Sequence, residues 1–333
     1  MSFPEAIVQI MTHKFIMGCP LYRQEQELKR MGIPLSHQTM SNRVLNASEI
    51  YLTPVYNYLH RELLQCEVLH ADETTLQVLH KPGKQPQSKS YMWLYRTRGD
   101  TDKPIVMYEY QPSRSASHPK EFLEGFNGYL HTDGYARYHN LPDGITVVEC
   151  CAHLRKKFDK AMKSHPKLKV KGSLAAQGLS FCSLLFGLED AFSGLTAEQR
   201  YEGRLKQAKP VLAALLAWAN SRNVTPKSTL GTAMKYLHDQ WPYLTNYMKD
   251  GRLELRNNRA EQSIKPFVID WKNFLFANTP SGAKGSAVIF TMIQTAIENG
   301  LDPHKYLTWL CGLQRTLILK AQKQSSACCH GMQ

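Results

Sequence analysis

The chain has 333 residues, enough to bury a large core and to form two domains or one domain with a large insertion. Lys and Arg outnumber Asp and Glu by 41 to 28, which gives a net charge of +13 that is spread along the chain. This charge favours a polyanionic partner such as nucleic acid, although a basic enzyme that never meets DNA would show the same balance.

Eight cysteines occur without any C-x-x-C pair, which argues against a zinc ribbon and against a thioredoxin-like redox motif. No signal peptide is evident, and no apolar run approaches the ~20 residues that a membrane-spanning helix needs. We therefore expect a cytoplasmic protein with reduced thiols and no membrane partner.

The first 65 residues predict helices. The segments PEAIVQIMTHKFI and NASEIYLTPVYNYLHRELLQ carry apolar residues at helical spacing. Between them, the break Gly32-Ile33-Pro34 separates two polar helical segments. This pattern resembles a DNA-binding helix-turn-helix, and it fits a plain helical hairpin equally well.

From residue 66 the sequence changes to short runs rich in Val, Leu, Tyr and Trp. The turn-forming segments KPGKQPQSK and TRGDTDK separate these runs and predict three antiparallel strands. A short helix at HPKEFLEGF follows, and then come strands in GYLHTDGYARYHNL and GITVVECCAHL with a second helix between them. The order strand, strand, strand, helix, strand, helix, strand is that of a ribonuclease H-like fold.

Helical periodicity without a strand signal then continues to about residue 250. We expect an α/β fold with a ribonuclease H-like core, which is a mixed five-stranded sheet with flanking helices, interrupted by a mainly α-helical insertion. The predicted parts are an N-terminal helical region (1–65), the first part of the core (66–154), the insertion (155–250), the rest of the core with the Glu261 helix (251–310) and an atypical C-terminal tail (311–333).

Three acidic residues stand where such a fold could use them: Asp72 in the first strand pair, Asp133 just beyond a later strand, and Glu261 near a helix start. Carboxylate oxygens are the ligands that Mg²⁺ prefers, and phosphate chemistry can use two such ions. Asp133 also fits an ordinary turn, and Glu261 could simply complement a helix dipole.

Asp72 is harder to explain in that way, because an unpaired carboxylate inside a strand costs several kcal/mol. Its neighbour Glu73 points to the opposite face of a regular strand. We therefore expect Asp72 to face a pocket and Glu73 to contribute little to catalysis.

Basic residues cluster along the sequence near these carboxylates. They form either a solvated basic face or contacts to DNA phosphates, and we favour phosphate contacts. Cys150 and His153 form a C-x-x-H motif that fits a buried thiol beside a histidine or, with further ligands, part of a metal site. The predicted DNA-binding residues are His153, Arg155, Lys156, Lys157, Arg256, Asn258, Arg259, Lys265 and Lys272.

Several long motifs resemble those of DDE transposases of the bacterial insertion sequence 66 family (TnpC type), in the family's order over roughly residues 3–310. They are PLYRQEQELKRMGIPLSHQTMSNRV, VLHADETTLQVL, YLHTDGYARYHNL, CCAHLRKKFDKA and RLELRNNRAEQSIKPFVIDWKNFLFANTPSGAKGSAVIFTMIQTAIENGLDP. The resemblance implies that Asp72, Asp133 and Glu261 bind two Mg²⁺ ions, for which Mn²⁺ could substitute. It implies metal-dependent DNA strand cleavage at insertion-sequence ends, followed by strand transfer.

The resemblance further implies that transposon ends and target DNA are partners, together with a synaptic homo-oligomer and accessory proteins of the same element. A bacterial cytoplasmic location, at the nucleoid when DNA is bound, follows from it. The zinc-ribbon-like module of longer family members is lacking in this sequence. The alternative function is therefore a truncated, catalytically inactive DNA-binding remnant of a transposase.

Overall fold

A computed structural model of the chain describes residues 4–134, 138, 140–164, 172–314 and 316. It divides into two compact units, each of which is built from several segments of the chain. The first unit comprises Met1–Cys66, Ala71–His118 and Arg259–Gln333, and the second comprises Glu67–His70 and Pro119–Asn258.

The strands form a mixed five-stranded sheet in the order β3-β2-β1-β4-β5. Their bounds are β1 (Val68–Gln77), β2 (Lys89–Thr97), β3 (Val106–Gln111), β4 (Gly128–Thr132) and β5 (Ile145–Glu149). β2 and β3 pair antiparallel, whereas β4 pairs parallel with both β1 and β5. This sheet with flanking helices confirms the predicted ribonuclease H-like α/β fold. The predicted helix between the fourth and fifth strands falls partly on residues 135–137 and 139, outside the described residues.

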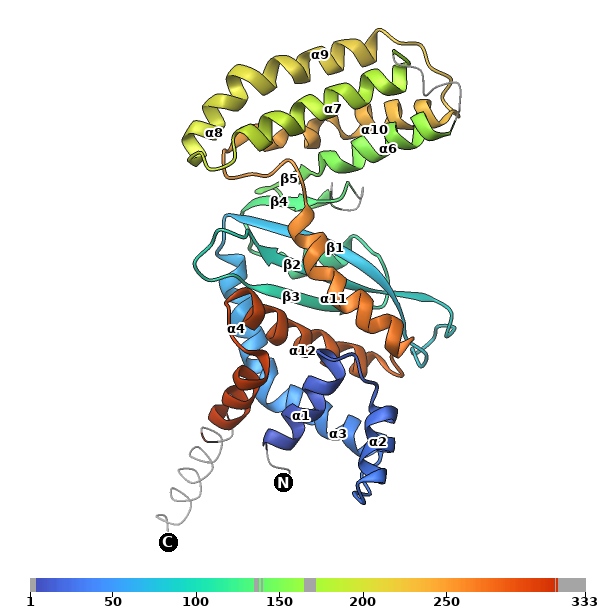
Figure 1. Ribbon diagram of the computed structural model, residues 1–333, viewed down its shortest axis with the longest axis vertical. Coiled ribbons are helices and arrows are strands. Elements are labelled where there is room, and N and C mark those ends of the chain that lie inside the picture. Colours follow the sequence, from blue (N-terminus) through green and yellow to red (C-terminus); the bar gives the residue numbers. More distant parts are fainter. Residues whose placement is uncertain (1–3, 135–137, 139, 165–171, 315, 317–333) are drawn as a thin grey trace. The chain divides into compact units, whose positions relative to one another are not determined.

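Most of the helices of the first unit come from the two ends of the chain (Figure 1). They are α1 (Pro4–Phe15), α2 (Leu21–Arg30), α3 (His37–Ala47), the π-helical turn η1 (Ser48–Leu52), α4 (Thr53–Leu64), α11 (Asn258–Phe274), α12 (Pro280–Glu298) and a helix over residues 303–314. The short helix α5 (Ser117–Phe122) begins in the first unit and ends in the second. Gly32, at φ 78°, makes the turn between α2 and α3, and the Ser36 hydroxyl caps α3 by accepting the Thr39 amide.

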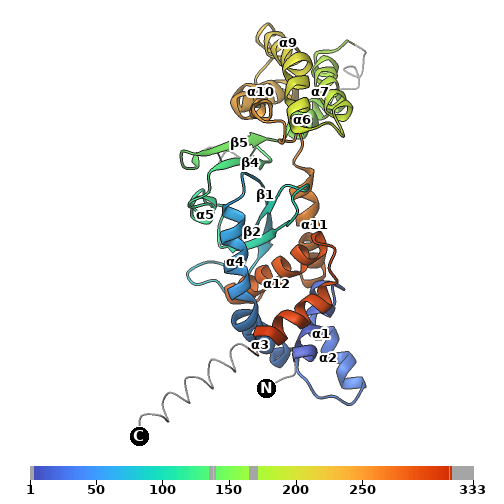
Figure 2. The same ribbon diagram turned by 90° about the vertical axis from the view of Figure 1, so that its left-hand side faces the viewer.

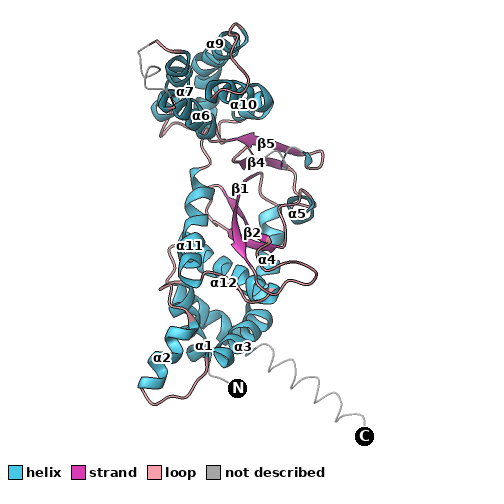
Figure 3. Ribbon diagram, turned by 90° about the vertical axis from the view of Figure 1, so that its right-hand side faces the viewer, coloured by secondary structure: helices cyan, strands magenta, loops and turns pink. Residues whose placement is uncertain are grey.

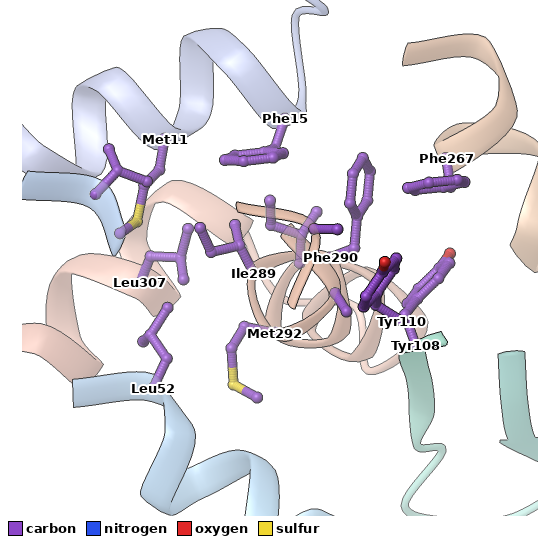
Figure 4. Close-up of a cluster of buried hydrophobic side chains, with 14 of the residues drawn as sticks. Met11, Phe15, Leu52, Tyr108, Tyr110, Phe267, Ile289, Phe290, Met292 and Leu307 are labelled. Atoms are coloured by element: carbon purple, nitrogen blue, oxygen red, sulfur yellow. The ribbon is translucent and has the colours of Figure 1, made fainter. Parts of the chain in front are cut away.

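The hydrophobic core of the first unit surrounds α12, which packs against β3 and against α1 and α3 (Figure 2). The ring centroid of Phe290 lies 5.4 Å from that of Phe15, 5.3 Å from that of Phe267 and 5.6 Å from that of Tyr108 (Figure 4). Helices from both ends of the chain are thus held on one face of β2 and β3 by aromatic packing.

The outer edge of β3 is covered by side chains from two helices. On α12, the Thr295 hydroxyl accepts the Val106 amide and donates to the Val106 carbonyl, and the Thr291 hydroxyl accepts the Tyr108 amide. On α4, the Tyr56 hydroxyl donates to the Tyr108 carbonyl at 3.0 Å. These bonds satisfy backbone groups that an edge strand would otherwise present to solvent.

The second unit combines β4 and β5 with a set of helices. They are α6 (Cys151–Lys163), α7 (Leu174–Ala191), α8 (Ala197–Gly203), the π-helical turn η4 (Arg204–Ala208), α9 (Lys209–Asn220), α10 (Thr229–Leu244) and the 3₁₀ turn η5 (Asn246–Lys249). In Figure 3, α6, α7, α9 and α10 gather without any strand between them. None of the described helices is long and apolar enough to cross a membrane.

A second hydrophobic core joins these helices to β5 through Val148, with Phe158 and Trp218 at its centre, their rings 6.1 Å apart. The fully buried Arg204 ties η4 to the segment that returns from the helices. Its guanidinium pairs with Glu189 at 2.9 and 2.6 Å and donates to the carbonyls of Tyr247, Asp250 and Leu253. A buried guanidinium with this many acceptors fixes the path of residues 247–253.

Candidate active site

The three predicted catalytic carboxylates are divided between the two units. Asp72 and Glu261 belong to the first unit, and Asp133 belongs to the second. The surroundings of each carboxylate are therefore described within its own unit. The convergence of the three carboxylates on one site stays a prediction.

Asp72 and Glu73 have different surroundings on β1. Asp72 is half-buried, and its Oδ1 accepts the Glu73 amide at 2.8 Å. The Glu73 side chain is only 1% exposed and is paired with Arg114, whose Nε lies 2.8 Å from Glu73 Oε1. The Arg114 guanidinium thus compensates the Glu73 charge inside the first unit, which gives that carboxylate a structural partner.

Glu261 lies in the first turn of α11, as the sequence predicts. Two residues later, the Ser263 hydroxyl accepts a hydrogen bond of 2.5 Å from Arg96, which is buried at the end of β2. The same guanidinium makes a bidentate pair with Glu298 of α12 at 3.1 and 2.7 Å. Arg96 therefore fixes the start of α11, and with it the backbone that carries Glu261, to the sheet of the first unit.

Asp133 follows the last residue of β4, and its Oδ1 is buried without a hydrogen-bond partner among the described residues. Gly134 comes next with φ 83°, a conformation that favours glycine. A Cβ at this position would lie 2.2 Å from the Tyr236 hydroxyl and 3.1 Å from Oε2 of the buried Glu149. The turn that carries Asp133 is therefore packed between a phenol from α10 and a carboxylate from β5.

The Tyr236 phenol beside the Asp133 turn stays protonated at neutral pH. Burial raises the pKa of this phenol, and the nearby Glu149, Cys150 and Asp133 raise it further. Lys157 of α6 lies over the same ring, with its Nζ 4.5 Å from the centroid. Lys157, predicted to contact DNA, thus has an aromatic partner beside the Asp133 turn.

The donor set fits a hard divalent cation. Asp72, Asp133 and Glu261 offer carboxylate oxygens, which Mg²⁺ and Mn²⁺ prefer. A buried carboxylate oxygen without a described partner, as in Asp133, is costly unless a cation or a proton compensates it. Cys150 Sγ accepts the backbone N–H of Asn257 at 3.2 Å.

Four of the predicted DNA-binding residues line one hollow of about 480 Å³ in the second unit. Arg155 and Lys156 enter it from α6, and Arg256 and Asn258 enter it from the segment that leads into α11. Helix α7 supplies the opposite wall, where the Arg256 guanidinium lies 4.6 Å from the Phe186 ring centroid and 3.6 Å from the Asp190 carboxylate. Three cationic side chains thus meet in a concave surface of the size of a phosphate-bearing ligand.

The other predicted DNA-binding residues lie outside this hollow. Lys265 and Lys272 are exposed on α11, four and eleven residues after Glu261 and therefore on a similar side of the helix. Arg259 belongs to the first unit, and its guanidinium lies against Gly99 after β2. His153 is half-buried in the first turn of α6.

Sequence reasoning missed a stacked pair of buried histidines, His70 and His131, and the two residues Glu149 and Tyr236 beside Asp133. A signal for the histidines was present. Each stands two positions before a candidate catalytic aspartate, in the triplets His-Ala-Asp and His-Thr-Asp. No sequence pattern links Tyr236 to Asp133, because about a hundred residues separate them.

The chain is similar in sequence to one protein family and to several curated proteins. A family model described as "Transposase IS66 family" matches residues 1–285. Uncharacterized protein y4qI of Sinorhizobium fredii (strain NBRC 101917 / NGR234) is 32% identical over 91% of this chain and 57% of its own length. Two further uncharacterized proteins of that strain, y4hP and y4jD, are 28% and 30% identical over 91% and 90% of this chain and 58% and 60% of their own lengths. The chain thus spans less than two thirds of these relatives, and no solved structure matches it.

Proposed function

The chain belongs to the IS66 family of transposases, and from this premise we propose that it cleaves DNA strands at insertion-sequence ends and joins them to target DNA. The proposal assigns catalysis to the carboxylates of Asp72, Asp133 and Glu261. Mg²⁺ is the proposed cofactor, with Mn²⁺ as a substitute.

In the proposed reaction the protein supplies no nucleophile of its own. Asp72, Asp133 and Glu261 would hold the cations, and the buried Oδ1 of Asp133, which has no hydrogen-bond partner among the described residues, is available to such an ion. Two Mg²⁺ ions, when bound, would lower the pKa of the attacking water or hydroxyl and offset charge on the leaving oxygen. Arg155, Lys156 and Arg256 hold the phosphodiester backbone without reading its sequence.

The observation that carries the proposal is the basic hollow beside the chain segment that leads into Glu261. Arg256 and Asn258 line this hollow, and Glu261 follows Asn258 by three residues on α11. The chain thus passes directly from a basic surface to a candidate catalytic carboxylate. A remnant that only binds DNA would need the hollow but would have no use for the three carboxylates.

The test is metal-dependent cleavage of a plasmid that carries the end sequences of the insertion sequence that encodes this chain. We expect nicking by the wild-type chain with Mg²⁺ or Mn²⁺ and none with EDTA. Asp72→Asn, Asp133→Asn and Glu261→Gln should each reduce the rate by about 10³-fold, which corresponds to the several kcal/mol that a bound ion contributes.

The matched control is Glu73→Gln, which alters the neighbouring carboxylate on the same strand. We expect it to keep cleavage within several-fold of wild type once circular dichroism shows that it is folded. Cleavage that needs no metal, or that survives all three carboxylate substitutions, would exclude the proposed mechanism. Retained DNA binding without any cleavage would favour the DNA-binding remnant.

A further inference from the structure

Two buried histidines join the parallel strands of the second unit. His70 on β1 and His131 on β4 are register partners, and their rings stack with centroids 4.5 Å apart at an interplanar angle of 10°. Both side chains are fully buried.

Both rings make hydrogen bonds to the segment that returns from the helices toward α11. His70 Nδ1 lies 2.9 Å from Oδ1 of the fully buried Asn257, and His131 Nε2 accepts the Glu254 amide at 3.2 Å. The backbone N–H of Asn257 donates to Sγ of Cys150, the residue that follows β5. We call His70, His131, Cys150 and Asn257 the histidine–asparagine network.

Each candidate catalytic residue lies a short distance along the chain from this network. Asp72 follows His70 by two residues, Asp133 follows His131 by two, and Glu261 follows Asn257 by four. The network therefore holds together three points from which the chain leads directly to the three carboxylates.

Stability alone does not account for a polar network in this place. Buried polar groups must be desolvated, and well-packed apolar side chains often stabilise a core as well as or better than they do. Hydrogen bonds between buried polar groups can instead specify one arrangement of the elements that they join. The stacked rings and directional bonds fix the ends of β1, β4 and β5 against residues 254–257.

We propose that the histidine–asparagine network is a positioning device that sets the geometry of the cation-binding carboxylates without touching DNA or metal. This inference rests on the proposed function. In this proposal Asn257 and the two histidines orient the chain segments that carry the carboxylates. Cys150 holds Asn257 in place by accepting its backbone N–H. The cysteine of the C-x-x-H motif thereby has a role as a hydrogen-bond acceptor.

The test compares Asn257→Ala, which removes the bond to His70, with Asn257→Asp, which keeps an acceptor oxygen. The matched control is Asn246→Ala, because the Asn246 side chain donates to the Val147 carbonyl of β5 at 2.7 Å, outside the network. The readouts are the half-saturating Mn²⁺ concentration for plasmid nicking, the thermal unfolding midpoint, and hydrogen exchange of the amides of residues 254–257.

We expect Asn257→Ala to raise the half-saturating Mn²⁺ concentration by about 10–100-fold, the usual effect of losing a residue that orients a metal ligand. Asn257→Asp should recover most of this loss. Asn246→Ala should lower the unfolding midpoint but leave the Mn²⁺ dependence unchanged. In Asn257→Ala, exchange at residues 254–257 should be at least about 10-fold faster than in Asn246→Ala.

An unchanged Mn²⁺ dependence in Asn257→Ala, or equal effects of Asn257→Ala and Asn246→Ala, would overturn the inference. A wild-type chain that does not cleave DNA would contradict the proposed function instead. Hydrogen exchange would still test the inference in that event. Unchanged exchange at residues 254–257 in Asn257→Ala would show that the network does not hold this segment.

Discussion

Asp270 on α11 is a carboxylate that is only 8% exposed, and burial raises its pKa to about 6. Because the folded state favours the neutral form, this group contributes most stability below its ordinary pKa near 3.8. That contribution falls as the pH rises from about 4 to 6. At neutral pH the folded protein carries a buried charge.

We predict that Asp270→Asn stabilises the first unit by about 1–3 kcal/mol at pH 7.5, because the amide removes the buried charge. The gain should shrink as the pH falls and disappear near pH 3, where Asp270 is protonated in both the folded and the unfolded protein. Chemical denaturation of both proteins at several pH values measures the difference. An equal difference at pH 4 and pH 7.5 would show that Asp270 is not held in an unfavourable environment.

Residues of the candidate site differ in how far the sequence could predict their surroundings. The division between Asp72 and Glu73 follows from strand alternation, and the structure gives Glu73 a buried ion pair with Arg114. The contact between Gly134 and Tyr236 could not be predicted, since it depends on how α10 packs on β5. Local patterns therefore identify candidate residues, while their partners depend on the folded topology.

Helix ends show a similar contrast at the scale of elements. Thr196 and Gln199 form a capping box at the start of α8, and Gly300 has a positive φ after α12; both residue patterns are typical of helix ends. The end of α11 is unexpected, because Leu275 adopts φ 67° and is the only described residue other than glycine with a positive φ. Its side chain is 66% exposed, so burial does not compensate this conformation.

We predict that Leu275→Gly stabilises the first unit by about 0.5–1 kcal/mol, because glycine adopts a positive φ without the steric cost that a Cβ imposes. Leu275→Ala is the control, since it shortens the exposed side chain but keeps the Cβ. Urea denaturation of the three proteins provides the comparison. Equal stability of the Gly and Ala variants would contradict a backbone origin.

At the scale of the whole molecule, each of the two compact units has its own hydrophobic core. Sequence periodicity predicts the helices of the second unit but does not predict Arg204, which lies in the π-helical turn between α8 and α9. Its partners come from α7 and from residues 247–253, up to 49 positions away. Such a residue is recognised only once the path of the chain is known.

We predict that Arg204→Met destabilises the second unit by about 3–5 kcal/mol, because it leaves Glu189 and three carbonyl groups without their buried cation. Hydrogen exchange should accelerate in α6, α7 and α10 while α12 and β3 stay protected, since their core is separate. Lys235→Met is the control, as it breaks an exposed pair with Asp239 and should change stability by less than about 0.5 kcal/mol. Uniform acceleration in both units would mean that the cores unfold together.

The covered strand β3 has a consequence for self-association. Thr291 and Thr295 of α12 and Tyr56 of α4 already bond the outward amides and carbonyls of Val106 and Tyr108. In the second unit, Asn246 likewise occupies the Val147 carbonyl of β5. A strand of a second copy is therefore blocked from pairing with β3 at Val106 and Tyr108, which hinders a common route to fibrous aggregation.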